Sequence, residues 1–130
     1  MIPIDEKLLQ HLIEQARQSP RKRMNYNLHE HLDDKVQRLL NALEPGTVLP
    51  IHRHPHTAET YLLLKGELNV LVYNDNKQLI ETVLLSQEQQ NYGLHIPAGT
   101  WHTVEVIRSA VILEIKEGPY CPLSEEDILA

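Results

Sequence analysis

Disulfide bonds and membrane-spanning segments are both missing from this sequence. Its 130 residues include one cysteine, Cys121, and no uninterrupted apolar run reaches the roughly 20 residues that a transmembrane helix needs. A single cysteine cannot form an intrachain disulfide, which excludes a small secreted scaffold held together by such bonds. The N-terminal residues show neither the basic start nor the long apolar centre of a secretion signal. We therefore expect a soluble, cytoplasmic protein with no membrane partner.

An excess of positive charge is also missing. The chain has 12 basic and 18 acidic residues and a formal net charge of −6. Nucleic-acid binding needs a basic surface, and the short cluster at 21–23 (RKR) is typical of a solvated turn. The sequence also contains no glycine-rich phosphate loop of the Walker or Rossmann type. We expect no nucleic-acid partner, and a nucleotide would have to be held in another way.

The first part of the chain has the pattern of an amphipathic helix. From Asp5 to about Arg17, apolar residues recur at helical spacing. They are Leu8, Leu9, Leu12, Ile13 and Ala16. Asp5 is placed to cap this helix and Pro20 to stop it. We expect the helix to pack by one face against the rest of a single domain.

Short runs rich in Val, Ile, Leu and Tyr follow, separated by turn-forming residues. The predicted strands lie near 36–43, 47–53, 59–64, 68–73, 79–85, 92–96, 102–107 and 110–116. Even spacing without intervening helices is typical of an antiparallel sandwich or barrel of the jelly-roll kind. We predict an all-β fold with an N-terminal α-helical arm (1–23), a jelly-roll β-barrel (24–120) and a C-terminal tail (121–130).

The stretch HRHPHTAE, residues 52–59, crowds three histidines and a carboxylate between two apolar runs. Side chains two residues apart in a strand point to the same side, so His52 and His54 should project together. Residues 55–58 would form a tight connection, and antiparallel pairing of the next strand would return Glu59 to the two imidazoles. The spacing predicts three metal ligands from one hairpin.

A fourth ligand would come from the segment IPAGTWHTV, where His102 begins a strand directly after a turn at Pro97 and Gly99. Three imidazoles and one carboxylate that leave coordination positions open suit Zn, Fe, Mn, Ni or Cu better than Mg or Ca. We therefore predict one divalent transition metal, bound by His52, His54, Glu59 and His102. The alternative is a protein that keeps these residues without the metal.

Several other polar residues could line a ligand site. Asn25, Asn27 and His29 alternate, so an extended chain would present all three on one side, either as backbone caps or as a polar strip that positions a ligand at the barrel mouth. Tyr61 shares parity with Glu59 and should face inward, where its phenol would donate to a bound oxygen or simply pack.

Four further residues could support the site, two by orienting a metal-binding histidine and two as candidate bases. Gln37 and Asn41 share one strand face and could orient a metal-binding histidine through its second ring nitrogen. Glu105 and Glu114 most simply face water, although inward placement would raise the pKa of either carboxyl and make it a candidate base.

Three more aromatic residues are expected to lie outside the chemistry. His56 should face solvent or the rim of the pocket, because a fifth protein ligand would close the metal site. His95 is expected at the surface, and Trp101, of opposite parity to His102, should serve in packing or in a contact between subunits.

These residues resemble the cupin superfamily. The first cupin motif is matched with every gap in place by Gly46, His52, His54, Glu59 and Gly66. The second motif is matched in part by Pro97, Gly99 and His102. Its leading glycine is displaced to Gly93 and its closing asparagine is Val106, which would make that wall apolar. The resemblance implies a cupin jelly-roll β-barrel with a metal centre.

The leader SPRKRMNYNLHEHLDDKVQRLLNALEPGT, the IPAGTWHTV segment and the ending EIKEGPY further resemble the WbuC family of small cupin metalloproteins. That family places a short helical arm and an N-x-N-x-H segment ahead of the barrel, and it is associated with bacterial O-antigen and cell-surface polysaccharide loci. It implies no settled reaction. The resemblance adds weight to Asn25, Asn27 and His29 as substrate-binding residues, with Tyr61 as a further candidate on its parity alone.

Two classes of function remain open. In the first, a metal enzyme acts on a sugar derivative or related small polar molecule, as an isomerase, an epimerase or a dioxygenase, with Tyr61 or His29 handling protons. In the second, the same metal anchors a small-molecule ligand in a binding or sensing module without turnover. A titratable group with a shifted pKa beside the metal would favour the enzyme. We also expect a homodimer.

Overall fold

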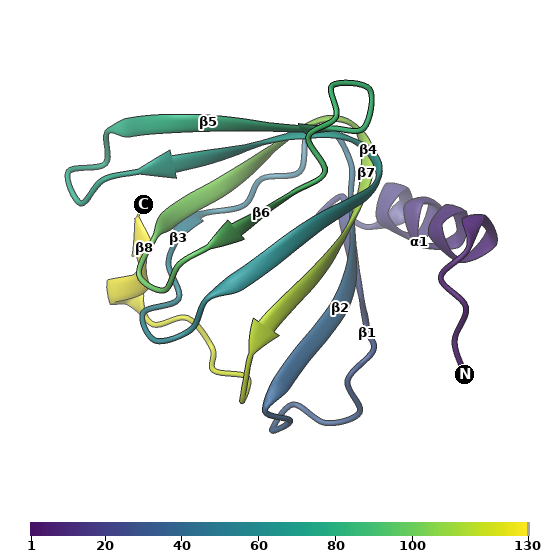
Figure 1. Ribbon diagram of the computed structural model, residues 1–130, viewed down its shortest axis with the longest axis horizontal. Coiled ribbons are helices and arrows are strands. Elements are labelled where there is room, and N and C mark those ends of the chain that lie inside the picture. Colours follow the sequence, from purple (N-terminus) through teal and green to yellow (C-terminus); the bar gives the residue numbers. More distant parts are fainter. Residues whose placement is uncertain (130) are drawn as a thin grey trace.

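The structure is a computed structural model that describes residues 1–129, and antiparallel strands dominate it (Figure 1). In chain order its elements are α1 (Glu6–Gln18), β1 (Arg23–Asn27), β2 (Val36–Leu43), β3 (Ile51–His52), β4 (Glu59–Tyr73), β5 (Leu79–Ser86), β6 (Gly93–Ile96), β7 (Trp101–Glu117), the short 3-10 helix η1 (Glu125–Asp127) and β8 (Ile128–Leu129). The all-β prediction with one N-terminal helix is confirmed. None of the described helices combines the length and apolar character needed to cross a bilayer.

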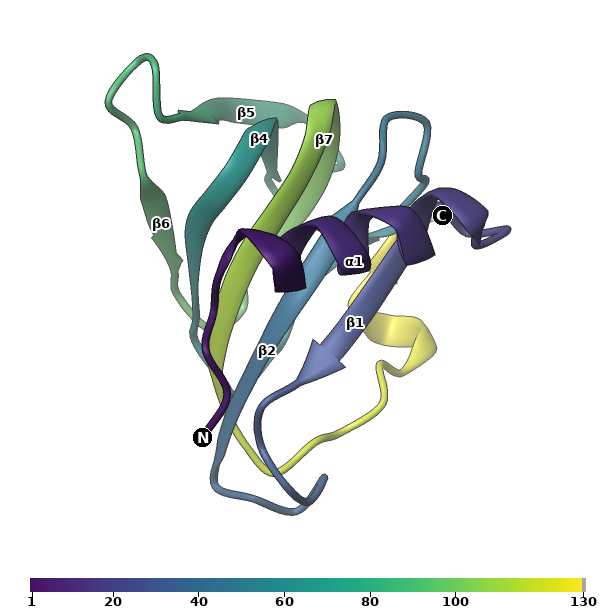
Figure 2. The ribbon, with the colours of Figure 1, turned by 90° about the vertical axis from the view of Figure 1, so that its right-hand side faces the viewer.

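The helix α1 forms where its sequence pattern predicts it. The side chain of Asp5 accepts a hydrogen bond of 3.0 Å from the backbone N–H of Leu8, which caps the first turn, and Ser19 follows the last turn. Its buried residues are Leu9, Leu12, Ile13 and Ala16. They pack on the outer face of the sheet, against residues of β2 and β7 (Figure 2). The helix therefore covers the barrel from outside and contributes no side chain to its interior cavity.

Strand β7 organises the sheet because it pairs with three others. It runs antiparallel to β2, to β3 and to β4, while β1 adds to the free edge of β2 and β8 to that of β3. Strand β4 also pairs with β5 and β6. Side chains directly opposite one another in such pairs point to the same face. Residues far apart in the sequence are thereby brought onto one inner wall.

Two of the predicted breaks between strands are wrong. Residues 59–64 and 68–73 belong to the single strand β4, and 102–107 and 110–116 belong to β7. The register between β4 and β7 shifts around Lys65 and Glu67, so Gly66 lies in an irregular, bulged part of β4 and not in a turn. Gly66 has a φ of +84°, which side chains other than glycine rarely adopt.

The pairing predicted for the histidine-rich hairpin is also wrong. Strand β3 is confined to Ile51–His52, shorter than the predicted 47–53, and it pairs with β7 and β8 but not with β4. Strands β1 and β8 were not among the predicted strands. Of the predicted tail, 121–130, the structure places η1 and β8 at the end, and Ala130 lies outside the described residues.

Candidate metal centre

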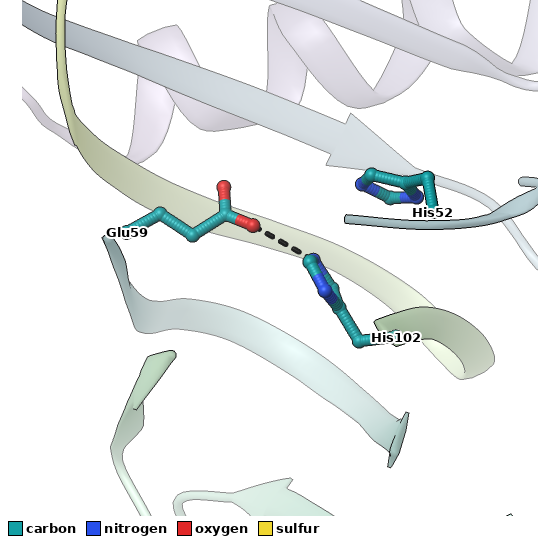
Figure 3. Close-up of side chains that lie close together, drawn as sticks. All are labelled: His52, Glu59 and His102. Carbon is teal, nitrogen blue, oxygen red and sulfur yellow. Dashed lines mark ion pairs between the residues drawn. The ribbon is translucent and has the colours of Figure 1, made fainter. Parts of the chain in front are cut away.

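Three side chains from three strands meet inside the barrel. His52 of β3 lies directly opposite His102 of β7, and the ring centroids are 4.5 Å apart. Glu59, the first residue of β4, points toward them, and its Oε1 lies 2.7 Å from His102 Nε2 (Figure 3). One ligand atom from each of His52, Glu59 and His102 lies within 4.8 Å of the other two. The three form a candidate metal site.

His54 lies beside this group but is not part of it. Its ring centroid is 5.2 Å from that of His52 and 6.2 Å from that of His102, and its Nε2 lies 3.6 Å from Glu59 Oε1. Because β3 ends at His52, strand alternation does not position His54. The backbone carbonyl of His54 instead accepts a hydrogen bond of 2.8 Å from Gly99 N. The fourfold ligand assignment stays a prediction.

Backbone carbonyls orient the two histidines of the group. His52 Nδ1 lies 2.9 Å from the carbonyl oxygen of Pro50, and His102 Nδ1 lies 2.9 Å from that of Thr100. A ring nitrogen that donates to a carbonyl leaves Nε2 as the metal-binding atom, an arrangement typical of metal-binding histidines. The donor set, two anchored imidazoles and a buried carboxylate, fits a divalent transition metal.

The suggested orienting role of Gln37 and Asn41 is wrong. The side-chain amide of Gln37 donates to the carbonyl of Asp34 at 2.9 Å, and that of Asn41 donates to Glu114 Oε1 at 2.9 Å. Each histidine binds a carbonyl only two residues before it, so no partner from β2 is needed.

Burial and mutual contact shift the pKa values of the group in different directions. Burial alone would lower the pKa of His102, but the hydrogen bond and charge of Glu59 outweigh it and raise that pKa. Burial would raise the pKa of Glu59, yet contact with His102 lowers it. Burial lowers the pKa of His52 and brings that of His54 to about 4. His52 and His54 are therefore neutral at pH 7, as metal binding requires.

Tyr61 faces inward, as its parity predicts. Its hydroxyl donates to Glu59 Oε1 at 3.2 Å and lies 3.3 Å from His102 Nε2. Burial, with the nearby charges of Glu59 and Glu114, raises the pKa of the phenol well above its ordinary value. Tyr61 thus stays protonated and braces the candidate ligands.

A cavity of about 440 Å³ opens beside the group. Aligned positions across the sheet build its wall. Asn27, Leu39, Glu114 and Tyr61 occupy one row through β1, β2, β7 and β4. Gln37, Lys116 and Glu59 occupy the next row. All of these residues line the cavity beside the histidines, and aliphatic side chains such as Leu43 and Ile112 complete a lining of mixed character.

Glu114 lies in this wall, so its expected exposure to water is wrong. Burial and the charge of Glu59 raise its pKa to about 7, while the hydrogen bond from Asn41 opposes the shift. Glu105, in contrast, is exposed as expected. Lys116, another residue of the wall, was not predicted from the sequence. Lys116 lies two and four residues after Glu114 and Ile112, and this spacing would have placed all three side chains on one face of their strand.

The alternating segment before β2 also reaches the cavity. Asn25 pairs with Asn41, and Asn27 with Leu39, so β1 extends the same sheet. His29 follows β1, is 7% exposed, and lies with both asparagines in the lining of the cavity. A polar strip therefore runs along this side of the pocket. Whether it binds a ligand stays a prediction.

His56, His95 and Trp101 lie outside the cavity lining. His56 is exposed, and His95, also exposed, has its Nδ1 2.9 Å from Thr60 Oγ1. Trp101 is buried, donates from Nε1 to Asp75 at 2.8 Å and has the guanidinium of Arg53 4.5 Å above its ring. Its packing role is as expected.

Comparison with known proteins places the chain in a family. A family model described as "Domain of unknown function (DUF6016)" matches residues 4–85. The chain belongs to the DUF6016 family. The matched range contains His52, His54 and Glu59 but not His102. No curated protein shows significant sequence similarity to this DUF6016 protein.

Solved structures confirm the cupin jelly-roll fold. The DUF6016 chain is similar to the capsular polysaccharide assembling protein CapF from Staphylococcus aureus (TM-score 0.59, 22% identity, 69% of this chain and 25% of that one). It is also similar to an oxalate oxidase in complex with glycolate (0.62, 19%, 82% and 56%) and to a cupin-2 domain protein from Shewanella frigidimarina (0.55, 20%, 73% and 80%). The chain thus spans a quarter of CapF and just over half of the oxalate oxidase. At these identities the likeness concerns the fold.

Proposed function

We propose that this DUF6016 protein binds one divalent transition metal through His52, His54, Glu59 and His102, and uses it to act on a sugar derivative or related small polar molecule. The observation that carries the proposal is the convergence of His52, Glu59 and His102 at the edge of a cavity that polar side chains help to line. Zn, Fe, Mn and Ni suit the nitrogen-rich donor set. When bound, such a metal supplies Lewis-acid chemistry that polarises an oxygen of the ligand.

The chain's own groups would orient the ligand and handle protons. Asn25, Asn27 and His29 offer hydrogen bonds from one side of the cavity, and Tyr61 offers a hydroxyl that stays protonated. Glu114, with a pKa of about 7, exchanges its proton near neutral pH, as a general acid or base must. A carboxyl that exchanges its proton near neutral pH, as Glu114 does, favours a metal-dependent isomerase or epimerase over a purely binding or sensing module. A dioxygenase remains the alternative reaction if the metal is Fe.

The cellular setting that we propose is bacterial O-antigen or cell-surface polysaccharide biosynthesis in the cytoplasm. The WbuC-like leader and C-terminal segments support it, and the similarity to CapF, a capsular polysaccharide assembling protein, agrees with it. The partners would be a small-molecule ligand and a second copy of the chain in a homodimer. The net charge of −6 argues against nucleic acid.

Metal titration at two pH values tests this function. We expect about one site per chain at pH 8, and an affinity at least about tenfold weaker at pH 5.5, because binding requires neutral imidazoles. Contact with Glu59 raises the pKa of His102, so a proton on His102 competes with the metal as the pH falls. The titration is followed by calorimetry on untagged, metal-free protein.

Ligand binding is measured on the same samples. Metal-loaded protein should bind a nucleotide sugar or a small keto acid that metal-free protein does not bind. An affinity that is flat from pH 8 to pH 5.5, or a metal that binds without enabling any such ligand, would contradict the proposed function.

A further inference from the structure

Two buried polar atoms in the wall of the cavity lack a hydrogen-bond partner within residues 1–129. They are His29 Nε2 and Asn41 Oδ1. His29 is 7% exposed and Asn41 9% exposed, and both residues line the cavity. Unpartnered buried polar groups are rare in native proteins, because each loses its hydrogen bonds to water without replacement. Neither atom has a part in the proposed metal coordination, so each calls for another explanation.

The orientation of the Asn41 amide is determined by its neighbour. Asn41 Nδ2 donates to Glu114 Oε1 at 2.9 Å, and when Glu114 is ionised its carboxylate can only accept, so the amide nitrogen and not the oxygen faces it. Oδ1 is therefore left as an acceptor without a donor. Asn41 also lies opposite Asn25 across β1 and β2, so it is part of the polar strip.

The contacts of His29 favour one tautomer. Its Nδ1 lies 3.1 Å from the backbone N and 2.9 Å from the carbonyl oxygen of Arg38. That carbonyl already accepts hydrogen bonds from Leu28 N at 2.7 Å and from His29 N at 3.3 Å. The tautomer in which Nδ1 accepts from Arg38 N–H satisfies more groups, and it places the proton on Nε2. The wall then contains a donor at His29 and an acceptor at Asn41 that have no partner within residues 1–129.

We infer that Asn41, supported by Glu114 and His29, is a specificity-determining residue that binds a hydroxyl group of the ligand. A hydroxyl both donates and accepts, so a ligand with several hydroxyls can satisfy both free atoms, whereas a ligand carboxylate offers no donor to Asn41 Oδ1. The inference rests on the proposed function and narrows it: the ligand carries hydroxyl groups on the side facing β1 and β2.

The test compares tartrate with succinate, which have equal length and charge and differ in two hydroxyl groups. Binding to metal-loaded protein is measured by calorimetry for the unmodified chain and for Asn41→Leu. We expect tartrate to bind more tightly than succinate, and Asn41→Leu to weaken tartrate about tenfold while leaving succinate unchanged, as the loss of one hydrogen bond requires. If Asn41→Leu folds poorly, Asn41→Ala removes the same oxygen without adding apolar bulk.

Asn69→Leu is the matched control. Asn69 Nδ2 donates to Glu105 Oε1 at 3.2 Å, an asparagine–glutamate pair like that of Asn41 and Glu114, but neither residue lines the cavity. This variant should keep the preference for tartrate. Equal affinity for the two acids, a preference that survives Asn41→Leu, or no binding of either acid by metal-loaded protein would each overturn the inference.

Metal analysis of the same samples distinguishes a failure of the inference about Asn41 from a failure of the proposed metal centre. If the protein and its Asn41 variants bind metal but show no hydroxyl preference that depends on Asn41, the inference fails and the proposed metal centre stands. If the unmodified chain binds no metal, the proposed function fails first.

Discussion

Replacing His102 with alanine is expected to weaken metal binding by more than about 100-fold, beyond the loss usual when a residue that merely orients a ligand is removed. His102 is fully enclosed, pairs with His52 across the sheet and contacts Glu59 at 2.7 Å. Its loss removes an imidazole and leaves the carboxylate of Glu59 without its closest partner. Elemental analysis of protein purified without a histidine tag, together with metal titration, measures the effect.

His56→Ala is the matched control for His102→Ala. His56 lies in the same histidine-rich stretch as His52 and His54 but is exposed and outside the cavity lining, so its removal should leave the metal content unchanged. Circular dichroism establishes that each variant is folded. Undiminished metal in folded His102→Ala protein, or equal losses in the two variants, would refute the assignment of His102.

Replacing Gly66 with alanine is expected to lower the free energy of unfolding by about 3 kcal/mol, from left-handed backbone strain and steric overlap together. Gly66 has a φ of +84°, and a Cβ there would overlap the backbone carbonyl oxygen of Ser109 on β7. Because backbone and not a flexible side chain stands in the way, relief requires β4 and β7 to move apart. Urea denaturation followed by circular dichroism measures the loss.

Gly99→Ala separates the two contributions. Gly99 has a similar φ of +80°, but a Cβ at that position would meet no atom within 4 Å. Its replacement should cost only the backbone strain, about 1 kcal/mol. If Gly66→Ala proved no more destabilising than Gly99→Ala, the close approach of β4 and β7 at the bulge would be incorrect.

Features of the fold that depend on neighbouring residues were predictable from the sequence. The helix follows from the spacing of its apolar residues and its cap at Asp5, and β2 has the bounds predicted for it, 36–43. The continuity of β4 was not predictable, because a glycine with positive φ serves a turn and a bulge equally well. Pairing with β7 decides between them, and at the bulge this pairing joins residues more than forty positions apart.

The site was predictable in its residues but not in its construction. Motif spacing singled out His52, Glu59 and His102, which the structure brings together. The predicted route, antiparallel pairing of the strands that carry His52 and Glu59, is wrong because both strands pair with β7 instead. Sheet order is a property of the whole chain, and strand alternation within one segment does not reveal it.

The contacts in the wall of the cavity also could not be predicted from the sequence. Alternation placed Gln37 and Asn41 on one face of their strand but could not identify what they bind. The partner of Asn41 is Glu114, which is 73 residues away in the sequence, on the strand next to β2. Only the register, which aligns Leu39 with Glu114, shows that this carboxyl faces inward.

The central claim is that His52, Glu59 and His102, with His54 beside them, hold a transition metal inside the barrel. Diffraction from crystals of untagged, natively purified protein, recorded at the absorption edge of its metal, tests this most directly. We predict one anomalous peak per chain, about 2.0–2.2 Å from the imidazole nitrogens and the Glu59 oxygen. A peak elsewhere, or no peak between these side chains in crystals grown with added metal, would contradict the claim.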